Sequence, residues 1–163
     1  MRRRLVFAVP CAALLAGCGF KLRQAPDFAF SSLYCGADTP LSNELKRDLT
    51  ASGKVQVYGD AKQIGDAQVV LDIPGDQRER VVVALNSAGQ VREIELRLRV
   101  TFRLRDRAGK ELIPDTQLLQ RRYVSYNATV VLAKESEEAL LYRDMQTDIV
   151  QQIMRRLAAV KEI

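Results

Sequence analysis

The longest regular pattern in the chain is an alternation of apolar and polar residues from position 93 to position 105. The apolar set is Ile94, Leu96, Leu98, Val100, Phe102 and Leu104. A period of two places the two sets on opposite faces of a β-strand. A strand of this length extends about 44 Å at roughly 3.4 Å per residue. We therefore expect helices to cover its apolar face, and water or a polar partner to meet its charged face.

Two segments carry a helical pattern. The first begins at Thr39, a suitable N-cap, with Pro40 in the first helical position, and Gly53 suits its C-terminal end. Its apolar residues recur every four positions: Leu41, Leu45 and Leu49. The second is expected to begin at Ser136, which two acidic residues follow. It keeps the same spacing through Leu141, Met145, Ile149, Ile153 and Leu157.

Shorter patterns predict the remaining elements. We expect strands over residues 28–34, over 67–73 with a continuation at 81–85, and within 116–126, and a short strand or loop edge at 55–58. Turns are expected at 86–89 and 106–109, and a turn or bulge at 74–76. These elements predict a single α+β domain over residues 27–163. Two helices pack on one face of a mainly antiparallel sheet of about four strands, which makes a two-layer sandwich.

The N-terminus has the order of a bacterial lipoprotein signal. Arginines 2–4 precede an apolar run over 5–15, which is too short to span a bilayer. Leu15-Ala16-Gly17-Cys18 resembles the lipobox, which implies removal of residues 1–17 and acylation of Cys18. Residues 18–26 then form a lipidated tether, and Gly19 favours the outer membrane over the inner one. An ordinary signal peptide with a chance cysteine, or an uncleaved anchor, is the alternative.

Composition excludes several classes of protein. The formal charge of +5 falls by three to +2 when the signal arginines leave, and export removes the remaining support for nucleic-acid binding. The chain has no histidine, so neither a Ser-His-Asp nor a Cys-His pair is possible, and we expect no enzyme, cofactor or metal. Asp144 and Asp148 lie four apart without further ligands nearby. Cys35, expected to be half-buried at a strand end, could instead pair with a partner chain or react.

Basic residues gather on and beside the long strand. They are Arg92, Arg97, Arg99, Arg103 and Arg105, with Arg78 and Arg80 on the neighbouring segment and Arg121, Arg122 and Lys134 later. Guanidinium groups match phosphates in a bidentate manner, and lipopolysaccharide carries phosphates. The alternative is a solvated sheet face on which the arginines are balanced by Glu93 and Glu95.

Five fragments in fixed order resemble the LptE family of lipopolysaccharide-assembly lipoproteins. They are Cys18-Gly19-Phe20-Lys21-Leu22-Arg23, the hairpin sequence over 86–96, Leu132-Ala133-Lys134-Glu135, Asp144-Met145 and the helical sequence over 151–157. The resemblance implies a non-enzymatic lipoprotein on the periplasmic side of the outer membrane. Members plug the lumen of the β-barrel translocon LptD, help that barrel to assemble and bind lipopolysaccharide during its transport to the cell surface.

The resemblance also implies where lipopolysaccharide binds. In relatives, basic residues lie at the hairpin and in the loop before the last helix. Lys134 occupies the loop position, whereas Gln90 stands where relatives can carry a basic residue. Arg92, two residues further and expected on the same strand face, is the candidate substitute.

The polar face of the long strand is the candidate barrel interface. It carries Arg97, Arg99, Thr101 and Arg103.

Two other classes of function stay open. One is an outer-membrane lipoprotein scaffold of another envelope assembly machine that does not bind lipopolysaccharide, and the other is a periplasmic hydrolase. The sequence leaves open which face would enter a barrel.

Overall fold

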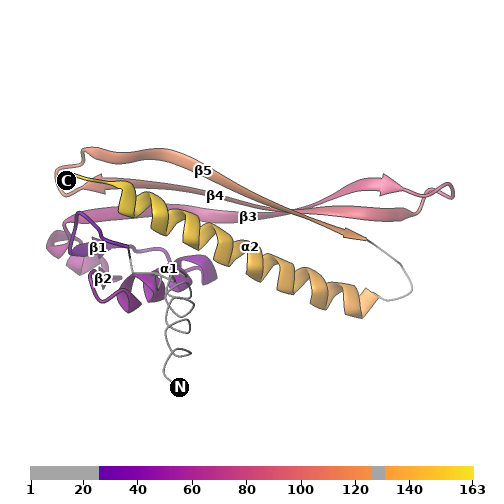
Figure 1. Ribbon diagram of the computed structural model, residues 1–163, viewed down its shortest axis with the longest axis horizontal. Helices are drawn as coiled ribbons and strands as arrows, with labels where there is room; N and C mark the ends of the chain where they lie inside the picture. Colours follow the sequence, from indigo (N-terminus) through magenta and orange to yellow (C-terminus); the bar gives the residue numbers. More distant parts are fainter. Residues whose placement is uncertain (1–25, 126–130) are drawn as a thin grey trace, which may run out of the picture.

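Three long strands and one long helix form most of the molecule (Figure 1). The computed structural model describes residues 26–125 and 131–163. The elements are β1 (Ser32–Tyr34), α1 (Pro40–Ala51), β2 (Gln56–Tyr58), the 3₁₀ helix η2 (Ala61–Asp66), β3 (Val69–Leu85), β4 (Val91–Asp106), β5 (Glu111–Ser125) and α2 (Val131–Ala159). The signal peptide, Cys18 and nearly all of the tether lie outside the described residues.

The strands form one mixed sheet in the order β2-β1-β3-β4-β5. β1 pairs in parallel with both β2 and β3, whereas the β3–β4 and β4–β5 pairs are antiparallel. The α+β class is confirmed, and the long strand pairs are antiparallel as expected, but the sheet is mixed and has five strands instead of about four. Helix α1 lies between β1 and β2 in the chain and provides the crossover that this parallel pair requires. β1 and β2 have three residues each. They lie within the strand expected over 28–34 and the short strand or loop edge expected at 55–58.

Helix α1 begins and ends as its sequence predicts. The Ser42 N–H donates to Thr39 Oγ1 at 3.2 Å, and the Thr39 N–H donates to Ser42 Oγ at 2.8 Å. This reciprocal capping box satisfies donors that a helix start leaves unpaired. Gly53 follows the helix with φ of +69°, a conformation that glycine adopts without strain.

The predicted alternation along β4 is confirmed. Its even-numbered residues from Ile94 to Leu104 are all buried against the helices. β3 remains one strand through Pro74 because a bulge between Asp72 and Gly75 absorbs the interruption. The tight turn between β3 and β4 places Gly89 at φ of +76°. The two strands thus form a long hairpin that extends past the other strands at one end of the molecule (Figure 1).

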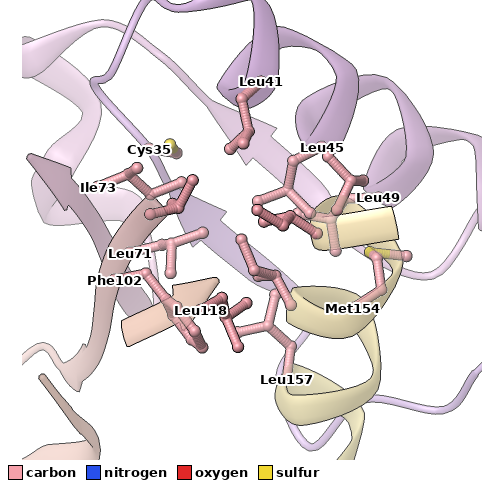
Figure 2. Packing of buried hydrophobic residues seen from close by; sticks show 14 of the residues in the cluster. Cys35, Leu41, Leu45, Leu49, Leu71, Ile73, Phe102, Leu118, Met154 and Leu157 are labelled. Atoms are coloured by element: carbon pink, nitrogen blue, oxygen red, sulfur yellow. The ribbon is translucent and has the colours of Figure 1, made fainter. Parts of the chain in front are cut away.

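The core lies between the sheet and both helices. Figure 2 shows the α1 leucines converging with Leu157 of α2 on Leu71, Phe102 and Leu118 of the sheet. Each fully buried aliphatic or aromatic side chain of this kind contributes about 1.5–3 kcal/mol relative to an exposed one. This layer fixes the position of β4 and so fixes where its other face points.

Helix α2 begins at Val131, five residues before the expected N-cap Ser136. The expectation is wrong because the acidic residues taken for a first turn belong to the helix body. There Glu137 pairs with Lys134, and Glu138 pairs with Arg80 of β3 at 3.3 Å. Within 26–125 and 131–163, no helix combines the length and apolar character that crossing a membrane requires.

Candidate functional site

The side of the sheet opposite the helices is a charged surface, which we call the open face. It comprises Asp72 and Glu79 of β3, Glu95, Arg97, Arg99, Thr101, Arg103 and Arg105 of β4, and Gln117, Arg121 and Tyr123 of β5. These residues come together because successive side chains of a strand alternate between faces and the register aligns three strands. The predicted set Arg97, Arg99, Thr101 and Arg103 lies on it, in line along β4.

Glu95 is the most deeply placed charge on the open face, with an exposed fraction of 3%. Arg97 Nε and Nη2 both donate to Glu95 Oε2, at 2.9 and 2.5 Å, and Arg121 Nε lies 3.5 Å from Oε1. The Arg97 hydrogen bond holds the pKa of Glu95 below its usual range, although burial acts in the opposite direction. The same bond raises the pKa of Arg97. The carboxylate is thus held charged by the two arginines.

Two further carboxylates each bridge a pair of arginines on the open face. Glu79 lies 3.8 Å from Arg97 and 3.5 Å from Arg99, measured between nitrogen and oxygen. Asp72 Oδ2 accepts from Nε of Arg103 at 2.9 Å and from Nε of Arg105 at 3.2 Å, and its proximity raises the pKa of Arg103. The open face therefore carries a network of ion pairs within and between neighbouring strands.

The expected cluster of arginines does not form a single surface. Arg78 lies over the Tyr142 ring with its guanidinium carbon 5.2 Å from the ring centroid, and Arg80 pairs with Glu138. Arg122 Nη2 donates to Asp148 at 2.6 Å. These three side chains face α2 because their even positions in β3 and β5 place them on the helix side of the sheet. The sequence shows the alternation within β4. Which residues of β3 and β5 share a face with those of β4 depends on the pairing register, which the sequence does not show.

The β3–β4 hairpin and the start of α2 lie at the same end of the molecule (Figure 1). Arg92 is the second residue of β4, and Lys134 is the fourth residue of α2. Arg92 is exposed. The ladder carries an extra residue between the pairs Leu85–Val91 and Ala84–Glu93. Gln90 lies in the turn before β4, and the irregularity falls at Arg92, so the strand register does not place these two side chains on one face.

Lys134 does not lie in a loop. It belongs to the first turn of α2, where its Nζ is 2.6 Å from Glu137 and its side chain is 20% exposed. The start of the helix, five residues earlier than expected, accounts for this correction. The positive charge of Lys134 is thus already paired within the helix.

A hollow in the open face was not predicted. It encloses about 580 Å³ beside the β3 bulge, and its lining includes Asp72, Pro74, Thr101, Arg103 and Asp115. The Pro74-Gly75 pair was the sequence signal for the bulge that creates it.

The nearby Cys35 is buried rather than half-buried, and burial raises the pKa of its thiol. In the described part of the chain, no group of His, Cys, Asp and Glu is arranged to hold a metal ion.

Comparisons with known proteins agree with this architecture. The family model LptE, described as lipopolysaccharide-assembly, matches residues 26–157. The solution structure of an uncharacterized lipoprotein B from Nitrosomonas europaea is 33% identical with a TM-score of 0.72, and the match covers 86% of this chain and 91% of that one. A minor lipoprotein from Acinetobacter baumannii is 28% identical with a TM-score of 0.61, covering 82% and 93%.

A rare lipoprotein B from Shewanella oneidensis shares the fold, with a TM-score of 0.65 at 23% identity, covering 79% of this chain and 92% of that one. No curated protein matches the chain.

Proposed function

The chain belongs to the LptE family of lipopolysaccharide-assembly lipoproteins, and from this membership we propose that it plugs and helps to assemble an LptD-like outer-membrane β-barrel and binds lipopolysaccharide there. The role is non-enzymatic. In this proposal Cys18 carries the acyl chains that anchor the protein to the outer membrane on its periplasmic side. Replacement of Cys18 by serine should leave unprocessed precursor, which mass spectrometry of the N-terminus would detect.

The open face is the observation that supports the plug. No helix among the described residues covers it, and it extends along the whole of the 16-residue strand β4. Its side chains are charged, so it does not suit lipid, whereas the interiors of large barrels are polar. Its arginines already share carboxylates such as Glu79 and Asp72. Hydrated packing against a barrel lumen therefore does not require burying isolated charges.

Lipopolysaccharide binding is assigned to Arg92 and Lys134. Arg92 is near the start of β4 and Lys134 is in the first turn of α2, two element ends that lie on the same side of the molecule, and Arg92 is exposed to solvent. Hydrogen bonds to charged groups contribute about 1.5–3 kcal/mol each. The double variant Arg92→Asp, Lys134→Asp should therefore bind lipopolysaccharide more than about tenfold more weakly, and binding of the wild type should weaken with salt.

A matched control changes the same charge in the last turns of α2 and the residues that follow it. Arg155→Asp with Lys161→Asp replaces two exposed cations there and should leave affinity close to that of the wild type. Affinity and barrel co-purification are measured on the same proteins. Lost affinity with an intact barrel complex supports a separate ligand site. Unchanged affinity of the Arg92 and Lys134 variant would leave a structural plug without this binding site.

A further inference from the structure

Among the described residues, one edge of the strand β5 pairs with no other strand, and we call it the free edge. β4 is its only strand neighbour among the described residues, and β5 ends the sheet (Figure 1). The register between β4 and β5 is uninterrupted from the pair Glu93–Ser125 to the pair Phe102–Thr116. An edge without bulges over this length is suited to pairing with another strand. The strand at the other edge of the sheet, β2, has only three residues.

The hydrogen bonds show which groups face that edge. The Asp106 N–H donates to the Lys110 carbonyl at 2.9 Å, so Asp106 faces β5. The backbone groups of successive β4 residues point alternately to β5 and to β3. The two register shifts of the β4–β5 ladder add residues to β5 and none to β4, so the alternation along β4 is unbroken and the backbone of Arg97 faces β3. Its partner Arg121 must therefore direct its N–H and C=O away from β4. In agreement, the Arg122 Nη1 donates to the Arg121 carbonyl at 2.9 Å.

By the same alternation, the odd-numbered residues from Gln117 to Ser125 present backbone donors and acceptors to the free edge. Regularly spaced N–H and C=O groups are complemented by another polypeptide backbone, whereas a lipid chain offers neither. Arg121 and Tyr123 flank the edge with side chains exposed by 54% and 61%. Tyrosine and arginine are the residue types that anchor protein interfaces.

We propose that the β5 edge from Gln117 to Ser125 pairs with an extended segment of the partner barrel, which carries an apolar residue opposite Tyr123 and an acidic or neutral one opposite Arg121. This inference rests on the proposed function. The segment lies outside the barrel's own closed ladder, because strands in a closed barrel already use both of their edges. The open face and the pairing edge then form one continuous interface along β4 and β5.

Hydrogen exchange tests the pairing directly. Exchange is followed at single-residue resolution in the protein alone and in its purified barrel complex. The edge-facing amides of Leu119, Arg121 and Tyr123 should slow by at least about 100-fold in the complex. The amides of Gln120 and Arg122, which face β4, are the internal control and should be slow in both. Edge amides that exchange as fast in an intact complex as in the free protein would overturn the inference.

A pair of variants tests the backbone contribution separately. Leu119→Pro removes an edge-facing N–H and leaves the β4 ladder intact, and edge strands tolerate proline at such positions. Leu119→Ala loses a side chain but keeps the N–H. The proline variant should dissociate from the barrel about tenfold faster than the alanine variant, and equal rates would contradict the pairing. Failure of every variant and the wild type to form a complex would instead refute the proposed function.

Discussion

Arg97 donates two hydrogen bonds to one oxygen of Glu95, its neighbour two positions earlier on β4, and so holds a buried carboxylate on the sheet face without helices. Arg121 reaches the other oxygen from β5. Glu95 therefore connects charges within β4 and between the two strands. Its removal would leave two arginines with like charges directly opposite each other in the register.

Glu95→Gln should lower the melting temperature at pH 7, because both arginines lose their shared anion. The pKa of Glu95 is depressed in the folded state. Because this pKa is lower in the folded state, the ionised carboxylate stabilises the fold at any pH above its unfolded pKa of about 4.3. The stabilisation is lost as the pH falls through the folded pKa. The difference between variant and wild type should therefore shrink at low pH.

Thermal melts across the acid range measure this difference. Glu93→Gln, on the same strand two residues earlier and half-buried, is the matched control and should melt close to the wild type. A deficit for Glu95→Gln that is independent of pH would show that the lost carboxylate charge is not the cause.

Tyr142 links the N-terminal half of α2 to the sheet. Its hydroxyl donates to the Glu79 carbonyl at 2.8 Å. Tyr142→Phe keeps the ring beneath Arg78 and should cost about 1 kcal/mol in the free energy of unfolding, measured with urea. Tyr58→Phe is the control, since none of the described residues hydrogen-bonds its hydroxyl. Equal losses for the two variants would contradict a stabilising role for this contact.

Glu137 neutralises Lys134 within α2. If Lys134 binds lipopolysaccharide phosphate, Glu137→Gln should strengthen lipopolysaccharide binding by up to about fivefold, since exposed pairs contribute about 0.2–1 kcal/mol. Glu135→Gln makes the same change in net charge at an exposed neighbouring position and should have a smaller effect. Binding isotherms that coincide for the two variants would indicate that net charge alone matters.

Local signals predicted much of the fold. The Thr39 cap, the leucine spacing of α1 and the alternation of β4 depend on neighbouring residues, and all three agree with the structure. Pairing between distant strands has no such local signal. The parallel contacts of β1 therefore could not be predicted, although Gly89 correctly marked the turn between β3 and β4.

The candidate site shows the same division. Alternation placed Arg97 and Arg99 on the open face, but the bulge beside Arg92 is a property of the paired strands. The burial of Glu95 likewise depends on Arg121 approaching from β5, which only the register reveals. The position of Lys134 was missed because Ser136 and the two acidic residues after it resemble a helix start, although the helix already begins at Val131.

Photocrosslinking tests most directly whether the open face meets the barrel. Photoreactive residues are placed at Arg97, Arg99 and Thr101 on the open face, and at Arg143 and Thr147, exposed on α2, for comparison. The account predicts that the open-face probes capture the barrel in outer membranes of living cells. Capture by the α2 probes while the open-face probes capture nothing would contradict it.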